Sequence, residues 1–389
     1  RFSGFADCLF ESVSGFTTTG MSVFSDVESL PKGILLWRSS IQWMGGMGIL
    51  AFLLAVLPSA DASMFTLFSA ESTGPTSSAK KITPRVKDTA KIVYLIYILM
   101  TVLLAILLAV VGIAPFDAIV CSLSAISTGG FSSMNASVGS FGNVAANMLV
   151  ALFTFLAGVN FSVYFLFAVK EFKSVLKDEE VRFYCLSSGI ICLIMIIDLI
   201  AHHIDFFTAL ENSVFLSAAV VSTAGFSAVS PNIWSTTTQI IVVIFSIIGS
   251  SSGSTGGGVK GIRVLIMMKS LKNEILKMIN PKVIKTVSIN GKTVDDTVVS
   301  KVAKFFFIYM FILLIGSLII SFDQKDFLTC FSVILASLSN AWTAIPTNIA
   351  DFHDFSVLSK SAMMFSMIAG RLEFFPLLAL FTPSVWKSK

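Results

Sequence analysis

The sequence predicts an all-α polytopic membrane protein with four pseudo-repeats around a central pore. The chain of 389 residues is 55% hydrophobic and only 13% charged, and its mean hydropathy is +0.86. Apolar segments of about 20 residues, the length of a membrane-spanning helix, recur along the chain and exclude a barrel of short strands. Shorter apolar runs stand between them, each followed by hydroxyl residues and, after three of the four runs, by glycine.

Each pseudo-repeat is expected to contain a helix, a re-entrant pore half-helix, a filter loop and a second helix. We expect repeat 1 in residues 1–79, repeat 2 in 80–182, repeat 3 in 183–285 and repeat 4 in 286–389. The chain starts at Arg1, shortly before the first half-helix. We therefore expect that the first helix of repeat 1 has been lost from this sequence.

The half-helices are too short to cross the membrane, so they must dip into it and deliver a loop to mid-depth. Irregular backbone at that depth survives only where it lines a water-filled cavity. We expect half-helices at 5–16, 117–126, 207–220 and 327–338, and full spans at 35–57, 92–112, 145–169, 183–199, 240–268, 302–320 and 361–381.

Charge sets the orientation of these segments. Most of the 27 Lys and Arg residues lie in three polar linkers, at 80–91, 170–182 and 260–304, which the positive-inside rule places in the cytoplasm. Because these residues flank hydrophobic spans, we expect membrane lipid beside them and no nucleic-acid partner. Carboxylates fall on the opposite side, where they either attract cations or simply solvate outer loops. They are Asp26, Glu28, Asp117, Asp205, Glu211, Asp323, Asp351 and Asp354.

The loops after the half-helices have the composition of an ion filter. A dehydrated monovalent cation needs several oxygen atoms at once, and carbonyl groups turned inward from four loops can replace its water shell. Glycine permits such a turn without a steric penalty. We predict that the filter consists of Thr18, Thr19, Gly20, Thr128, Gly129, Gly130, Thr223, Ala224, Gly225, Asn340, Ala341 and Trp342.

Helix packing is the other interpretation of these small residues, because Gly, Ser and Thr let membrane helices approach closely. One such motif would be weak evidence for a filter. Three copies, at 14–20, 127–132 and 222–227, each follow a short apolar run and precede a full span. This repetition favours a filter for a monovalent cation over helix packing, and we expect no transition metal there.

A gate is predicted below the filter, in the loop 249–260. Residues 249–258 are Gly, Ser and Thr only, between strongly apolar segments, so a continuous helix there would be costly. A flexible linker in water is the alternative, but the flanking spans favour a loop at membrane depth. Arg371 lies in another apolar span, where an unpaired charge costs about 2.5 to 3.5 kcal/mol. It needs water or a partner.

The motifs resemble those of the Trk/Ktr family of potassium transporters across essentially the whole chain. The residues that carry the resemblance are Ser14 to Gly20, Ser127 to Ser132, Thr83-Pro84-Arg85 followed by Ala90-Lys91-Ile92, and Gly253 to Lys260. In that family each repeat carries one filter glycine, and the intramembrane loop and an arginine form the gate. The resemblance implies these gate residues: Gly253, Ser254, Thr255, Gly256, Gly257, Gly258 and Arg371.

The resemblance also implies the setting in which the chain works. It implies a bacterial cytoplasmic membrane, passive movement of K⁺, a homodimer, and a cytoplasmic nucleotide-binding subunit that docks on the basic linkers. No cofactor and no enzymatic activity are expected, because no nucleophile and base or metal cluster stands out. The sequence leaves open whether Na⁺ replaces K⁺ and whether the protein is a channel or a coupled transporter.

The fourth filter departs from the pattern because Trp342 stands at the glycine position. The loop could be shifted, which leaves a three-sided filter, or the indole could point outward. In the third interpretation the pore is blocked at Trp342, and the protein is a non-conducting membrane scaffold for a partner protein.

A small polar cluster lies at the outer end of one span. Asp198 and His202 are four residues apart on one helix face, with His203 and Asp205 close by, so one pair of metal contacts is geometrically possible. A hydrated helix end is the better interpretation.

Overall fold

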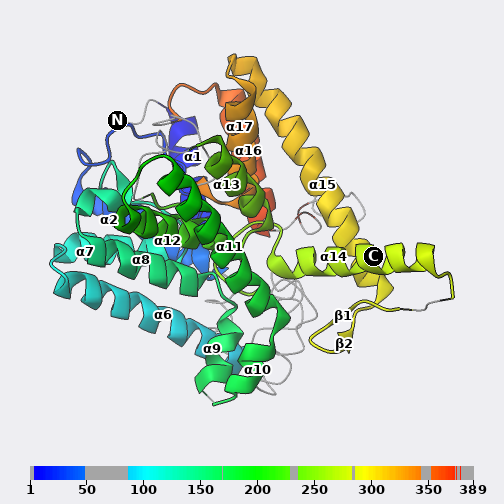
Figure 1. Ribbon diagram of the computed structural model, residues 1–389. Coiled ribbons are helices and arrows are strands. Elements are labelled where there is room, and N and C mark those ends of the chain that lie inside the picture. The colour runs from blue at the N-terminus through cyan, green and yellow to red at the C-terminus, as the bar shows by residue number, and fades with distance from the viewer. Residues whose placement is uncertain are drawn as a thin grey trace.

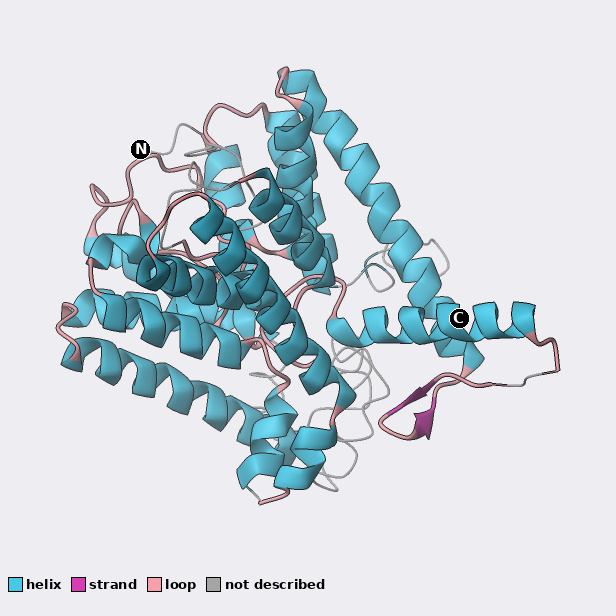
Figure 2. Cartoon of the chain, viewed as in Figure 1, coloured by secondary structure: helices cyan, strands magenta, loops and turns pink. Residues whose placement is uncertain are grey.

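The computed structural model describes residues 4–48, 86–168, 170–227, 235–282, 285–342, 352–372, 374 and 377. Within these ranges the chain is helical apart from one short antiparallel hairpin, as Figures 1 and 2 show. Some predicted features lie outside the described residues. In the predicted spans, these are residues 49–57 of the 35–57 span and, apart from 374 and 377, residues 373–381 of the 361–381 span. The linker residues Lys80, Lys81 and Arg85 and the carboxylate Asp351 also lie outside.

The elements follow one another in four groups along the chain. The first group holds α1 (Phe5–Phe16) and α2 (Lys32–Gly46); the second holds α6 (Val86–Val110), α7 (Pro115–Ile126), η1 (Ser137–Phe141), α8 (Val144–Ala157), α9 (Phe161–Ala168) and α10 (Phe172–Lys177). The third holds α11 (Glu179–Ala201), α12 (Phe206–Ser222), α13 (Thr236–Ile248) and α14 (Gly261–Ile279). The last holds β1 (Ser288–Ile289), β2 (Lys292–Thr293), α15 (Asp296–Ile320), η3 (Ser321–Asp323), α16 (Phe327–Ser339) and α17 (Val357–Leu372).

Three helices in the described part of the chain are long and apolar enough to cross a membrane. They are Lys91–Val110, Glu179–Ala201 and Asp296–Asp323. Their lipid-facing character follows from composition, because an apolar helix that is mostly exposed needs an apolar solvent. The short apolar helices α7, α12, α13 and α16 lie among them (Figure 1).

The predicted continuous span at 145–169 is wrong, because the structure breaks it into α8 and α9, which meet at 94°. The side chain of Asn160 accepts a hydrogen bond from Ser162 N at 2.9 Å and so starts α9 afresh. The open backbone groups at the break are used by the loop 249–260: Gly158 O accepts from Ser251 N at 3.1 Å, and Phe161 N donates to Gly253 O at 3.0 Å.

Carboxylates lie at the starts of the re-entrant helices. Asp205 caps α12 by accepting from Phe207 N at 3.0 Å, and Asp326 caps α16 by accepting from Thr329 N at 3.1 Å. Asp7 and Asp117 stand in the first turns of α1 and α7. A negative charge is favourable at the positive end of a helix, so each of these helices points its negative end toward the loop that follows.

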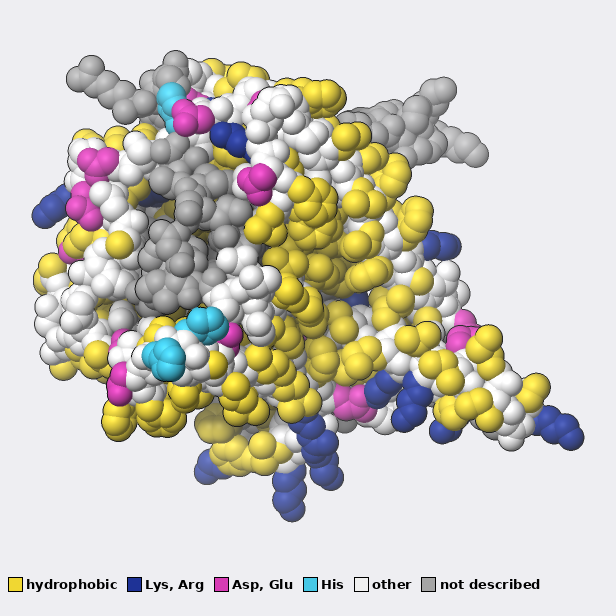
Figure 3. Space-filling view, turned by 45° about the horizontal axis from the view of Figure 1, so that its top comes forward, with side chains coloured by type: hydrophobic (Ala, Val, Ile, Leu, Met, Phe, Trp, Pro, Cys, Tyr) yellow, Lys and Arg dark blue, Asp and Glu magenta, His cyan; other side chains and the backbone are white. Residues whose placement is uncertain are grey.

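The helices pack into two main cores. One lies among α1, α15, α16 and α17, and the other among α6, α7, α8 and α12. Helix α14 projects from the bundle above the hairpin (Figure 1). In Figure 3 most of the dark blue Lys and Arg side chains gather at the lower edge and lower right, beyond a broad yellow hydrophobic face.

Candidate ion pathway

All four re-entrant helices end in the same backbone motif. One or two positions past the end of each helix, a residue other than glycine has a positive φ: 57° at Thr18, 54° at Thr128, 58° at Thr223 and 49° at Asn340. A positive φ is rare for a β-branched residue, and it is strained. The sequence predicts the strained turn at the glycines, and this earlier position differs from that prediction.

Two backbone hydrogen bonds close each of these turns. The N–H of the positive-φ residue donates three residues back, and the next N–H donates five residues back, which is the Schellman pattern. The longer bonds join Thr19 N to Ser14 O, Gly129 N to Ser124 O, Ala224 N to Ala219 O and Ala341 N to Ala336 O, each at 2.9 Å. The fourth loop therefore shares this cap with the other three.

The predicted filter glycines adopt a second positive φ. The angles are 83° at Gly20, 81° at Gly130 and 73° at Gly225. A Cβ added to Gly130 would lie 2.7 Å from Ala224 O, closer than real Cβ atoms approach. Trp342 holds the corresponding place in the fourth loop and is not among the described residues with a positive φ.

The loops also touch one another. Asn340 Nδ2 donates to Thr19 Oγ1 at 2.9 Å, and Trp342 N donates to Thr19 O at 3.2 Å, which joins the first and fourth loops. A Cβ on Gly20 would collide with Gly129 O. The structure thus brings the predicted filter residues of all four loops into one cluster.

Oxygen atoms of the four positive-φ residues have different partners. Thr128 Oγ1 donates to Ser127 O at 2.7 Å, and Thr223 Oγ1 accepts from Gly257 N at 2.7 Å. Thr18 Oγ1 and Asn340 Oδ1 are buried, and among the described residues they have no hydrogen-bond partner. Buried oxygens of this kind fit a dehydrated cation, which needs ligands from several loops.

The Trp342 ring is half-buried and packs edge-on against Phe352, with ring centroids 5.2 Å apart at 71°. Phe352 is itself fully buried, and its N–H donates to Ser22 O at 3.0 Å. This aromatic contact lies beside the first loop, so Phe352 holds one side of the indole.

The loop 249–260 lies against the inner ends of the re-entrant helices. Gly258 N donates to Ser339 O at 3.0 Å, at the end of α16. Thr255 Oγ1 donates to Ile126 O at 3.0 Å, at the end of α7. A Cβ on Gly257 would strike Ser339 O, so only glycine fits there. The loop is therefore held in place by hydrogen bonds to these helix ends and is not a flexible linker.

Other predicted gate residues hold the loop together. Gly253 and Gly258 have positive φ values of 69° and 78°. Ser254 Oγ donates to Ser251 O at 2.6 Å. A Cβ on Gly256 would lie 2.5 Å from Ser222 O, at the end of α12. These features make the loop compact and place it close to a third re-entrant helix.

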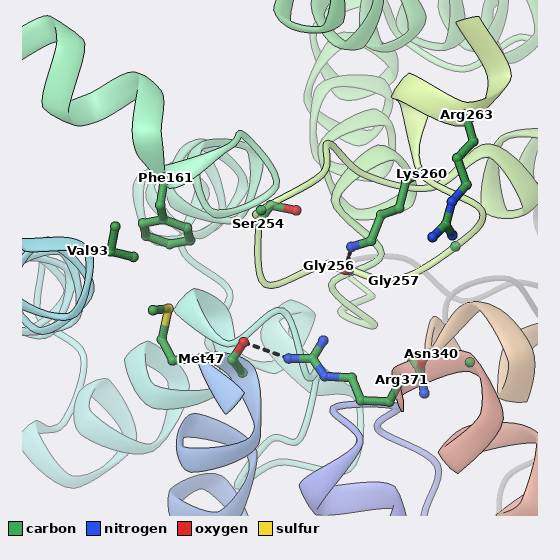
Figure 4. Close-up of a pocket in the computed structure, with 14 residues that line it drawn as sticks. Met47, Val93, Phe161, Ser254, Gly256, Gly257, Lys260, Arg263, Asn340 and Arg371 are labelled. Atoms are coloured by element: carbon green, nitrogen blue, oxygen red, sulfur yellow. Dashed lines mark hydrogen bonds between the residues drawn. The ribbon is translucent and has the colours of Figure 1, made fainter. Parts of the chain in front are cut away.

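Arg371 connects the loop to the first repeat (Figure 4). Its Nη1 donates to Thr255 O at 2.7 Å, and its Nη2 donates to Gly45 O at 2.7 Å and to Gly46 O at 2.6 Å. Three carbonyl groups thus accept from one guanidinium, whose several donors suit such a task. A charge in an apolar span needs such partners, and these carbonyl groups supply them to the half-buried Arg371.

A cavity of about 110 Å³ opens beside the loop (Figure 4). Lys260, Arg263 and Arg371 line it together with Asn340 of the fourth loop. Lys260 Nζ donates to Gly256 O, and Arg263 lies over the Phe305 ring at 3.9 Å. Three cationic side chains beside the predicted filter make this cavity unfavourable for a cation.

Several polar residues that were not predicted from the sequence also hold the loops. Gln42 donates to Gly129 O at 2.8 Å and accepts from Phe131 N at 3.1 Å. Arg38 and Glu11 form a buried ion pair at 2.7 Å. A buried polar residue within an apolar segment was the available signal, because such residues need partners.

The outer cluster around Asp198 has a structural role. Asp198 Oδ2 accepts from Ser235 Oγ at 2.5 Å and from Thr238 Oγ1 at 2.8 Å, which ties α11 to the start of α13. His202 is exposed. Among the described residues no group of three His, Cys, Asp or Glu side chains is placed to hold a metal.

Fold and site together define a multi-pass helical membrane protein in which re-entrant loops meet above an intramembrane loop, the architecture of an ion-transport protein. The profile of the family described as TrkH, cation transport protein, matches residues 2–388. The chain belongs to this TrkH family of cation transport proteins. The family is one of transporters and not of enzymes, and the chain is a multi-pass protein of the bacterial inner membrane.

Individual relatives agree with this assignment. The chain is 34% identical over 387 residues to the Trk system potassium uptake protein TrkH of Vibrio parahaemolyticus, covering 98% of this chain and 80% of the relative. It is 33% identical over 388 residues to TrkG of Escherichia coli, covering 99% and 79%. A crystal structure of the V. parahaemolyticus potassium transporter TrkH matches with a TM-score of 0.83 at 32% identity, covering 98% and 79%. The predicted all-α membrane fold and the family resemblance are confirmed.

Proposed function

We propose that the chain moves K⁺ passively across the membrane through a filter made of its four loops. The observation that carries this proposal is the Schellman cap repeated at the ends of α1, α7, α12 and α16. Because the same cap closes all four turns, the four loops would leave their helices in the same way and bring their oxygen atoms together. Potassium is favoured over sodium because the relatives are named potassium uptake proteins.

The filter would work by replacing the water shell of the ion. The negative ends of the four half-helices face the cluster and favour a cation there. Backbone carbonyls supply most ligands, and the buried Thr18 Oγ1 and Asn340 Oδ1 supply two more. Glycine at 20, 130 and 225 lets the loops approach closely enough to share one ion.

The loop 249–260 would act as the gate, and the conformation described here would be closed. The N–H of Gly257 donates a hydrogen bond to Thr223 Oγ1, which belongs to the proposed filter. Arg371 binds Thr255 O of the same loop. A cation that leaves the filter inward would meet both the loop and the cationic cavity, so opening requires that these hydrogen bonds separate.

Trp342 favours the competing function, a scaffold with a blocked pore. The contact between its ring and Phe352 supports conduction instead, because it holds the indole beside the loops. Of the three interpretations, a Trp342 side chain packed to the side is the one that this contact favours. The capped fourth loop argues against a loop that has shifted away.

From the family resemblance we further propose a homodimer and a cytoplasmic nucleotide-binding subunit that docks on the basic linkers. Lys173 and Lys177 are exposed on α10, and α14 exposes Lys272 and Lys277. Such cationic surfaces suit an anionic partner.

Growth on low K⁺ of a bacterium that lacks its own potassium uptake tests the function. The parent should restore growth, and Gly130→Ala should reduce K⁺ uptake by at least about tenfold, because a left-handed non-glycine residue costs about 1–2 kcal/mol and its Cβ also clashes. Gly189→Ala is the matched control, since a Cβ there meets nothing within 4 Å.

The outcomes separate the two functions. If the well-expressed parent fails and Trp342→Gly restores growth, tryptophan blocks the pore and the scaffold function stands. If uptake by the parent survives Gly130→Ala unchanged, ions do not pass the four-loop cluster. Uptake of Na⁺ as fast as K⁺ would contradict the choice of potassium.

A further inference from the structure

Glu180 is a buried carboxylate at the start of α11, only 6% exposed. It belongs to neither the filter nor the predicted gate. Burying a charged group is costly unless hydrogen bonds compensate it. Its partners therefore indicate what it does.

Both carboxylate oxygens bind the intramembrane loop. Ser252 N donates to Oε1 at 2.6 Å, and Ser252 Oγ donates to Oε2 at 3.0 Å. Ser252 stands in the first half of the loop, next to Ser251, whose N–H is bound to Gly158 O. Glu180 thus fixes the loop from α11 at Ser252, whereas Arg371 binds the loop at Thr255 O.

The two residues before Glu180 bind the cytoplasmic hairpin. Asn290, at the tip of the hairpin, accepts from Glu179 N at 2.8 Å and donates from Nδ2 to Asp178 Oδ2 at 2.9 Å. Lys269 of α14 pairs with Glu179. Three consecutive acidic residues therefore join the hairpin, α14 and the loop.

We propose that Glu180 is a positioning residue that latches the intramembrane loop in its closed conformation, and that the hairpin holds this latch in place through Asn290. The proposal rests on the proposed gating function. It adds a regulatory contact, because a partner that moves the hairpin on the cytoplasmic side would act on the loop through residues 178–180. Three consecutive residues, 178–180, thus contact both the hairpin and the loop.

A helix-capping role is the competing explanation, since carboxylates near a helix start stabilise it. Asp178 already performs that task, because its Oδ1 accepts from Glu180 N at 2.9 Å and from Val181 N at 3.1 Å. A capping residue would affect the stability of α11 alone. A latch affects the opening of the loop.

The test compares the full-length parent with Glu180→Ala, Glu180→Gln and Ser252→Ala. Hydrogen exchange of the peptide 249–260 in detergent should speed up by about tenfold for Glu180→Ala, because hydrogen bonds to a charged group are the strong class. Glu180→Gln and Ser252→Ala should give smaller increases. Partner-free K⁺ uptake into proteoliposomes should rise in the same order.

Controls assign these effects to the latch. Glu274→Gln removes the same charge from an exposed ion pair on α14 and should leave the loop unchanged. Asn290→Ala should speed exchange of the loop less than Glu180→Ala does. Adding Ser252→Ala to Glu180→Ala should have no further effect, because the two residues share one contact.

Unchanged loop exchange in folded Glu180→Gln and Glu180→Ala proteins would overturn the latch, and unchanged exchange in Asn290→Ala would overturn the hairpin connection. If loop exchange rises but no variant, nor the parent, carries K⁺, the latch stands and the proposed transport function fails.

Discussion

At the scale of single residues, the four positive-φ positions show how the loops are specified. Thr18, Thr128, Thr223 and Asn340 each pay a steric penalty of about 1–3 kcal/mol for a left-handed backbone. Glycine would remove the penalty, but it would also remove the side-chain oxygen. Residues that keep an oxygen at a strained position are typical of a binding site.

The ion pair between Glu11 and Arg38 is a second residue-scale feature. Glu11 Oε2 accepts from Val23 N at 3.1 Å, just past the first of the four capped loops, and Arg38 Nη2 donates to Ser22 Oγ at 3.0 Å. The guanidinium also lies 4.1 Å from the ring centre of Phe131 in the second loop. One buried pair thus supports two loops.

Arg38→Met should destabilise the protein by about 3–5 kcal/mol, because it leaves the Glu11 carboxylate buried and unpaired. Thermal unfolding of the purified protein measures this loss. Adding Glu11→Gln should recover part of the stability, since the charge is then gone. Lys277→Met, which breaks an exposed pair, is the control. A loss for Arg38→Met no larger than for this control would contradict the argument.

At the scale of elements, the half-helices could be predicted because length and composition alone decide them. A mostly apolar run of 12 residues such as 115–126 is too short to cross a bilayer. The glycines after them were equally visible. The preceding Thr positions were not, because threonine carries no sequence signal for a left-handed turn and only the surrounding structure imposes it.

The break between α8 and α9 could not be predicted from hydropathy, because residues 145–169 are apolar throughout apart from a few polar positions. Its cause lies about 90 residues away, in the loop whose backbone binds Gly158 O and Phe161 N. The direction of the Trp342 ring likewise depends on a side-chain contact, the one with Phe352. Tertiary contacts decide both features.

Two asparagine caps test the break. Asn160→Ala and Asn143→Ala each remove a side chain that accepts from helix N–H groups, and each should cost about 1 kcal/mol in stability. Only Asn160→Ala should also speed hydrogen exchange of 249–260, because α8 and α9 bind the loop where they meet. Thermal unfolding and exchange measure the two effects. Equal exchange in both variants would show that the break does not support the loop.

At the scale of the whole molecule, opposite charges mark the two membrane sides. A hydrogen bond from Asn135 lowers the pKa of Asp26, and one from Thr329 lowers the pKa of Asp326. Because each pKa lies below the ordinary aspartate value of 3.8, both carboxylates are charged at any pH above that value. Any stability they add is lost only as the pH falls through the lowered pKa. Asp26 and Asp326 are therefore anionic at neutral pH, which favours the approach of cations.

Accessibility to a membrane-impermeant maleimide tests this orientation. In a version whose five cysteines are replaced by alanine, Asp354→Cys should react in intact cells, because Asp354 is exposed beside the outer start of α17. Lys173→Cys, exposed on α10, should react only after the membrane is permeabilised, because basic segments stay in the cytoplasm. The cysteine-free version is the control for background labelling. The reverse labelling pattern would mean that the protein has the opposite orientation in the membrane. The loop 249–260 would then lie on the outer side of the proposed filter, and a gate controlled from the cytoplasm would have no physical basis.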